Sequence, residues 1–189
     1  MFKFDDNSSQ DFKKDFMLSL KYLMQSETGS AIIKELQSSD TVFTIKECTW
    51  INSSDSAEGA DFFDPKTNTI YWSGKWTLLA KNGNYNSPAI CLMHELTHAW
   101  EKRTKTGMAT YQKFINNNRQ NLMSNKFDKP TEEFATFIEK NVAADLGECK
   151  GRDFYNDLQW VPNDRNNPTK YYSVQRKVSS PLEHSGINR

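Results

Sequence analysis

The sequence predicts an α+β fold in one compact domain that spans residues 1–189, and three observations lead to this prediction. Apolar residues recur at helical spacing near the N-terminus and again within residues 87–107 and 128–147. Between them, residues 41–80 are rich in β-branched and aromatic residues, which are typical of strands. A length of 189 residues with 37% hydrophobic residues suits one domain with a sizeable core better than two domains.

Two helices are expected before residue 40. Asp11 precedes a run whose apolar residues recur every three or four positions, and Gly29 lies where such a helix would end. The apolar residues of this run are Phe12, Phe16, Leu20, Leu23 and Met24. A second, shorter helix is expected over SAIIKELQ, residues 30–37.

Strands are expected in the next forty residues, so the domain contains a small sheet. The segments TVFTIKECTW (41–50) and TNTIYWSG (67–74) are β-branched and aromatic, and the second follows the turn-forming DPKTN. A third strand is expected over WTLLA (76–80). Further on, the polar stretch KFINNNRQNLMSNKFDKP (113–130) is expected to connect two helices, and the chain after Tyr155, mostly beyond residue 160, to be loop or partly disordered.

The segment SPAICLMHELTHAWEKRTKTG (87–107) predicts a helix. Ser87 is a favourable N-cap, Pro88 a favourable first residue, and Gly107 is expected just past the end. A separate apolar stripe of Leu92, Leu96 and Ala99 would pack this helix into the core.

The same helix carries the motif H-E-x-x-H. His94 and His98 are four residues apart, so both imidazoles lie on one face and can reach a single metal ion. Glu95 is about 100° around the axis from His94, which leaves its carboxylate free to act as a general base on water. The alternative is a helix with two hydrogen-bonded histidines and no metal. Cys91, one turn before His94, is expected to pack rather than to bind.

Catalytic zinc takes three protein ligands, so a third one is needed. His184 lies in the polar tail and is more simply a solvated residue. The segment DKPTEEFATFIEKNVAADLG (128–147) predicts a second helix that begins near Pro130 and ends near Gly147. Glu132 and Glu133 lie in its first turn, where acidic residues are also common because of the helix dipole. Either glutamate is a candidate ligand.

Arg152 and Tyr155, in GRDFY, are candidates for oxyanion stabilisation. A fixed cation and a phenol donor that face a metal would stabilise the charge that develops on a peptide carbonyl during hydrolysis. A surface salt bridge and a half-buried tyrosine explain the same spacing equally well.

These motifs together resemble a known family. HELTH, then EE, then R-x-x-Y is similar to the NleD-type family of bacterial effector zinc metalloproteases, and the active-site pattern resembles that of clostridial neurotoxin light chains. The resemblance covers about residues 60–160. It implies a zincin-like fold of gluzincin type and one Zn²⁺ ion held by His94, His98 and Glu133, with Glu132 as an outer group. It further implies that Glu95, Arg152 and Tyr155 are catalytic.

The resemblance also implies a zinc endopeptidase that is secreted into a host cell, acts in its cytoplasm and cleaves signalling proteins such as stress-activated MAP kinases. Zinc peptidases of this kind pair an extended substrate with an edge strand, and TNTIYWSG is either such a strand or an ordinary core strand. Two alternatives stay open, namely a cytoplasmic regulatory metallopeptidase that acts on a repressor-like partner and a non-catalytic binding domain in which zinc joins two helices. A closed structural site would need Cys91 or His184 as a fourth ligand.

Charge and composition exclude several partners. The 24 basic and 24 acidic residues balance, without a basic block for nucleic acid, and no long apolar run predicts membrane insertion. The N-terminus carries acidic residues where a Sec signal peptide would carry basic ones. Three cysteines without paired spacing indicate a reducing compartment and no disulfide framework. A monomer that acts on a protein substrate is expected.

Overall fold

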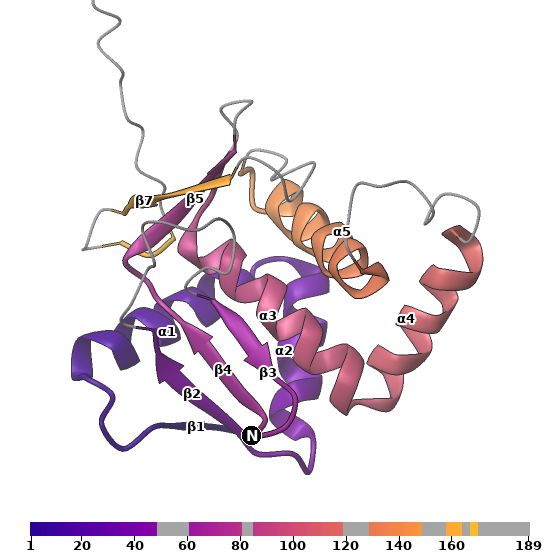
Figure 1. The fold of residues 1–189 in the computed structure, drawn as a ribbon, viewed down its shortest axis with the longest axis horizontal. Helices are drawn as coiled ribbons and strands as arrows, with labels where there is room; N and C mark the ends of the chain where they lie inside the picture. The colour runs from indigo at the N-terminus through magenta and orange to yellow at the C-terminus, as the bar shows by residue number, and fades with distance from the viewer. Residues whose placement is uncertain (49–60, 81–84, 119–128, 149–157, 164–166, 170–189) are drawn as a thin grey trace, which may run out of the picture.

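The computed structural model describes residues 1–48, 61–80, 85–118, 129–148, 158–163 and 167–169 (Figure 1). It contains five α-helices and two small β-sheets within these residues, which confirms the predicted α+β class. The elements in chain order are β1 (Phe2–Phe4), α1 (Gln10–Leu23), α2 (Glu27–Ser38), β2 (Phe43–Glu47), β3 (Phe62–Asp64), β4 (Thr69–Trp72), β5 (Trp76–Ala80), β6 (Tyr85–Asn86), α3 (Pro88–Arg103), α4 (Lys105–Asn118), α5 (Pro130–Asp145) and β7 (Leu158–Pro162).

The larger sheet has the strand order β1-β2-β4-β3. Strands β1, β2 and β4 are parallel, and β3 runs antiparallel to β4, with Phe63 opposite Ile70. The smaller sheet is antiparallel, in the order β6-β5-β7. The three predicted strands are therefore confirmed as β2, β4 and β5, but β4 is an interior strand and β3 is the edge. Of the two alternatives for TNTIYWSG, the structure therefore supports the ordinary core strand and not the edge strand.

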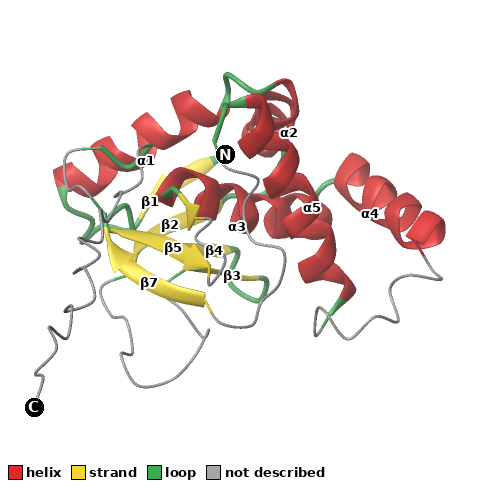
Figure 2. Ribbon diagram, turned by 90° about the horizontal axis from the view of Figure 1, so that it is seen from above, coloured by secondary structure: helices red, strands yellow, loops and turns green. Residues whose placement is uncertain are grey.

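Helix α3 runs through the middle of the molecule. It contacts all four other helices as well as strands β3 to β6, and Figures 1 and 2 show the helices gathered on one side of the larger sheet, with α4 and α5 at one end. The core fills the space between sheet and helices and includes Phe16, Phe43 and Trp72, all fully buried. Trp72 Nε1 donates a hydrogen bond of 2.8 Å to the Pro88 carbonyl, which fastens β4 to the start of α3.

Two glycines that were expected to end helices lie instead inside the following helix. Helix α1 ends at Leu23, and Gly29 is buried near the start of α2. A Cβ atom on Gly29 would lie 2.4 Å from the Leu23 carbonyl oxygen. Likewise α3 ends at Arg103, and a Cβ atom on Gly107, in α4, would lie 2.1 Å from the Trp100 carbonyl oxygen. Both glycines allow a close approach between consecutive helices, so the predicted helix ends were wrong.

Two segments predicted as irregular contain regular structure. The first six residues of the polar stretch 113–130 belong to α4, and residues 158–162 form β7, which pairs with β5. Polar composition misled the prediction because α4 is mostly exposed and a strand of five residues is too short to give a clear pattern. No helix in the described part of the chain has the length and apolar character that a bilayer crossing requires. Cys48 and Cys91 are both buried.

Candidate metal centre

The helix α3 places the two histidines in the middle of the fold. Its first turn is capped as predicted, because the Ser87 hydroxyl accepts the backbone N–H of Ile90 at 3.3 Å and Pro88 takes the first helical position. Ser87 is itself held by the carboxylate of Glu148 at 2.8 Å. The predicted stripe of Leu92, Leu96 and Ala99 is fully buried. This packing fixes the rotation of α3 and so fixes where its histidines point.

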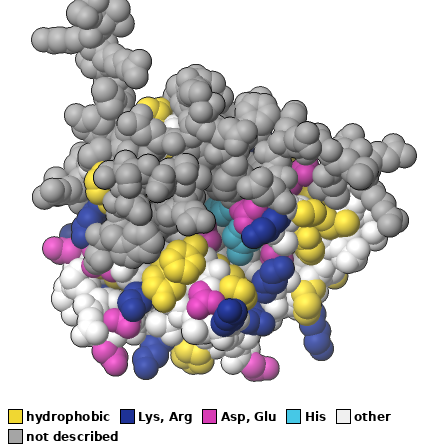
Figure 3. Space-filling model, viewed as in Figure 1, with side chains coloured by type: hydrophobic (Ala, Val, Ile, Leu, Met, Phe, Trp, Pro, Cys, Tyr) yellow, Lys and Arg dark blue, Asp and Glu magenta, His cyan; other side chains and the backbone are white. Residues whose placement is uncertain are grey.

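Three donor atoms from two helices converge at this point. The Nε2 atoms of His94 and His98 are 3.1 Å apart. Glu132, in the first turn of α5, places Oε2 3.1 Å from Nε2 of His94 and 3.3 Å from Nε2 of His98. The three residues form the one group in the described part of the chain whose geometry could hold a metal ion. In the space-filling view of Figure 3, histidine surface is visible beside acidic side chains on the face seen in Figure 1.

The structure brings Glu132, and not the expected Glu133, beside the two histidines. Glu132, expected as an outer group, lies against both histidines, whereas Glu133 lines a pocket of about 440 Å³ between α4 and α5. Neighbouring helical residues point about 100° apart, so the two side chains leave α5 in different directions. The sequence-based choice of Glu133 as the third donor therefore does not match the geometry, and Glu132 takes its place in the proposal below.

Two further carboxylates face the outer nitrogens of the imidazoles. His94 Nδ1 lies 3.0 Å from Oε2 of Glu139, and His98 Nδ1 lies 3.5 Å from Oε1 of Glu101. The side chains of Glu139 and Glu101 are both completely buried. Sequence reasoning missed both residues. Each lies seven positions after a donor on its own helix, Glu101 after His94 and Glu139 after Glu132, and that spacing is a signal for a shared helical face.

The charge of the site is strongly negative. Glu95 is also buried, with 7% of its surface exposed, and its charge acts on His98. Burial alone would lower the pKa of His98, but contacts with Glu101 and Glu132 and the charge of Glu95 outweigh it and raise that pKa to about 10. Burial would raise the pKa of Glu132, yet its hydrogen bonds to the two histidines lower it below its ordinary value. The site therefore attracts positive charge.

The donor set fits a small divalent ion such as zinc. Tetrahedral zinc with bonds of about 2.0–2.1 Å to nitrogen and oxygen sets its ligand atoms roughly 3.3–3.4 Å apart. The separations among His94 Nε2, His98 Nε2 and Glu132 Oε2 are 3.1, 3.1 and 3.3 Å. Two imidazoles and one carboxylate are also the donor types of catalytic zinc sites. Both the spacing and the chemistry of the donors thus suit the ion that the sequence predicted.

Other predicted residues fall outside this group. Cys91 is buried, with Sγ 4.0 Å from the Asn86 carbonyl oxygen, and it is not among the grouped donors. Arg152, Tyr155 and His184 lie outside the described residues, so their predicted roles stay predictions.

The fold and the site together define the class of this protein as a candidate metallopeptidase. On an α+β scaffold, the central helix carries H-E-x-x-H, and a glutamate from a second helix lies beside the two histidines. The chain belongs to the Peptidase_M91 family, described as effector protein, whose model matches residues 3–143. That match includes the whole of α3 and α5 up to residue 143 and so contains every residue of the donor group. No curated protein and no solved structure matches the chain. The protein is thus a peptidase of an effector family.

Proposed function

We propose that the protein is a zinc-dependent endopeptidase of gluzincin type, with one zinc ion held by His94, His98 and Glu132. The convergence of three lone-pair donors carries this proposal. Both Nδ1 atoms face carboxylates, so with a metal bound each imidazole can keep a proton on Nδ1 and offer the lone pair of Nε2 to the ion. Without a metal, the raised pKa of His98 keeps its imidazole protonated and hydrogen-bonded to Glu132, and a zinc ion would displace that proton and bind the same three atoms, which lie within 3.3 Å of one another.

The mechanism assigns the chemistry of hydrolysis to residues around this cation. A bound zinc ion supplies Lewis acidity that polarises a carbonyl group and lowers the pKa of water. Glu95, on the helical turn of His94, takes the proton of the attacking water and then delivers it to the leaving amine. Burial of Glu95 keeps bulk water from competing for that proton. By the resemblance, Arg152 and Tyr155 stabilise the oxyanion.

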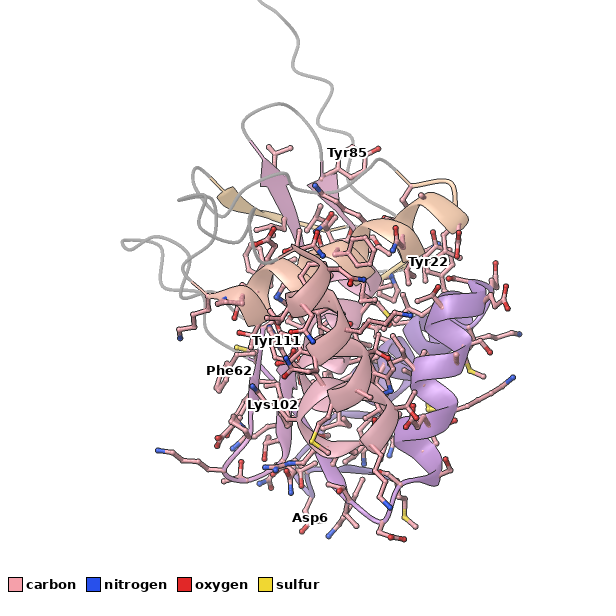
Figure 4. The ribbon with its side chains drawn as sticks, turned by 90° about the vertical axis from the view of Figure 1, so that its right-hand side faces the viewer. Asp6, Tyr22, Phe62, Tyr85, Lys102 and Tyr111 are labelled. Carbon is pink, nitrogen blue, oxygen red and sulfur yellow. The ribbon has the colours of Figure 1, made fainter. Side chains whose placement is uncertain are left out.

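Strand β3 is the part of the sheet that suits an extended substrate. It is the last strand of the larger sheet in the described residues and packs against α3. Its Phe62 is 41% exposed and stacks on Tyr71 of β4 at 4.3 Å, and Figure 4 shows this side chain at the outer side of the sheet. A substrate that adds a strand to β3 would gain main-chain hydrogen bonds and an aromatic contact.

The effector family and the resemblance together favour a protein substrate inside a host cell. Stress-activated MAP kinases are the class of substrate that the resemblance implies, and they provide the first candidates for an assay. An effector that acts inside another cell also agrees with three cysteines that lack paired spacing, because this pattern is typical of a reducing compartment.

Metal content and cleavage, measured on the same samples, test this function. Wild type and Glu95→Gln are each expected to hold about one zinc per chain, whereas Glu95→Gln loses cleavage of the kinase by a factor of about 10²–10⁴. Glu27→Gln, a matched change at an exposed glutamate of α2, should keep both zinc and cleavage.

The contrary results are distinct. Wild type that stays free of metal after reloading with zinc would overturn the metal centre. Cleavage that survives in Glu95→Gln would remove Glu95 from the role of base. Zinc binding without cleavage of any protein would favour the alternative of a zinc-joined binding domain.

A further inference from the structure

Each histidine of the donor group has a buried carboxylate behind it, and these two carboxylates come from different helices. Glu139 of α5 faces His94, and Glu101 of α3 faces His98. Burying a carboxylate is costly unless its charge is paired and its oxygens accept hydrogen bonds. Two such groups behind one pair of imidazoles therefore require a compensating interaction. The N–H of His94 provides it for Glu139, whereas the oxygens of Glu101 accept no close hydrogen bond and make only ion-pair contacts with His98 and Lys102.

The two carboxylates are not held equally well. Glu139 Oε2 lies 3.0 Å from His94 Nδ1, and its Oε1 accepts a 2.7 Å hydrogen bond from the side-chain amide of Asn86, which is itself buried in β6. Glu139 is thus fixed from both sides. Glu101 Oε1 lies 3.5 Å from His98 Nδ1, an ion-pair distance rather than a close hydrogen bond, and its nearest cation is the half-exposed Lys102 at 3.4 Å.

We infer that Glu139 and Glu101 are positioning residues that hold both imidazoles in the tautomer with a proton on Nδ1, and that Glu139 is the more important of the two. This inference rests on the proposed zinc centre. A carboxylate behind an imidazole fixes the ring, directs the Nε2 lone pair at the metal and increases the basicity of the ligand. Neither Glu139 nor Glu101 supplies one of the three donor atoms, so both act through the histidines.

Helix geometry explains why the two residues occupy these positions. Glu101 follows His94 by seven residues and His98 by three, and Glu139 follows Glu132 by seven. Seven residues are close to two turns, which returns the chain to the same face. One face of α3 therefore supplies two donors and one positioning carboxylate, and one face of α5 supplies the third donor and the other positioning carboxylate.

Zinc affinity, measured by competition with a chromophoric chelator, tests this inference without a cleavage assay. Glu139→Gln keeps an oxygen that can accept the His94 proton but loses the charge, and is expected to weaken zinc binding about tenfold. Glu139→Leu loses both and should weaken binding about a hundredfold. Glu101→Gln should have a smaller effect than Glu139→Gln. The matched control is Glu35→Gln, because Glu35 contacts α3 through Trp100 Nε1 and not through a histidine, so affinity should stay unchanged.

A spectroscopic readout on wild type removes any dependence on the folding of the variants. Nitrogen NMR of the zinc-loaded protein should show both His94 and His98 protonated at Nδ1 and metal-bound at Nε2. A proton at Nε2 of either ring would overturn the inference, as would Glu139 variants that bind zinc like wild type. Those results leave the proposed function standing. Wild type that binds no zinc would remove both proposals together.

Discussion

The choice between Glu132 and Glu133 as the third donor gives the sharpest test of the proposed site, because the two residues differ by one position and share the same chemistry. Glu132→Gln removes the charged donor that lies 3.1 and 3.3 Å from the two Nε2 atoms. Glu133→Gln makes the same chemical change at the pocket between α4 and α5. Any difference between the variants therefore reports geometry and not composition.

The magnitude follows from the number of donors. If a site with several protein ligands binds zinc with about 10–16 kcal/mol, loss of one donor costs about 3 kcal/mol, which is a factor of roughly 10² in affinity. Glu132→Gln should reach this value, and Glu133→Gln should stay within about twofold of wild type. Chelator competition measures both. Tight binding by Glu132→Gln together with weak binding by Glu133→Gln would refute the orientation of α5 described above.

Three further predictions concern stability. Gly107→Ala places a Cβ atom against the Trp100 carbonyl oxygen and should lower the free energy of unfolding in urea by about 1–3 kcal/mol; an unchanged midpoint would contradict the close approach of α4 to α3. Trp72→Phe leaves the buried Pro88 carbonyl without its donor and should cost about 2–3 kcal/mol in the same assay, and a cost near zero would contradict that link. Burial raises the pKa of Glu148, so the folded state retains a proton that the unfolded state has lost, and stability should fall as pH rises from about 4.5 through the folded pKa. Glu148→Gln should reduce this slope, which unfolding curves at several pH values would reveal, and equal slopes would contradict the raised pKa.

Local signals in the sequence predicted the ends of helices where the cause is local. Ser87 and Pro88 begin α3, and Gly147 follows α5 with a φ of 72°, a conformation that favours glycine. Gly29 and Gly107 gave the same signal for a different reason. Their lack of a side chain serves contacts between helices, and a close approach of that kind depends on tertiary packing that a local pattern does not contain.

The histidine pair was predictable because spacing alone places both rings on one face of a helix. Identifying the third donor required knowledge of which face of α5 is turned toward α3. In the sequence, Phe134, Phe137 and Ile138 indicate one apolar side of that helix, yet Phe137 is 47% exposed. A better signal was present in the sequence. Glu132, Ala135, Glu139 and Val142 recur at positions i, i+3, i+7 and i+10, and this stripe faces inward with two glutamates on it.

A glutamate on the buried face of a helix conflicts with ordinary core patterning, and that conflict is itself informative. Glu101 and Glu139 have no exposed surface on their side chains, and local rules would place apolar residues there. Natural sequences break such rules mainly at functional sites, where another interaction compensates for the cost. Here the compensating groups are the imidazoles of His94 and His98, and beyond them the proposed cation. Helices α3 and α5 each bury a glutamate on the face that they turn toward each other. These buried glutamates therefore indicate the proposed metal centre almost as directly as the H-E-x-x-H motif does.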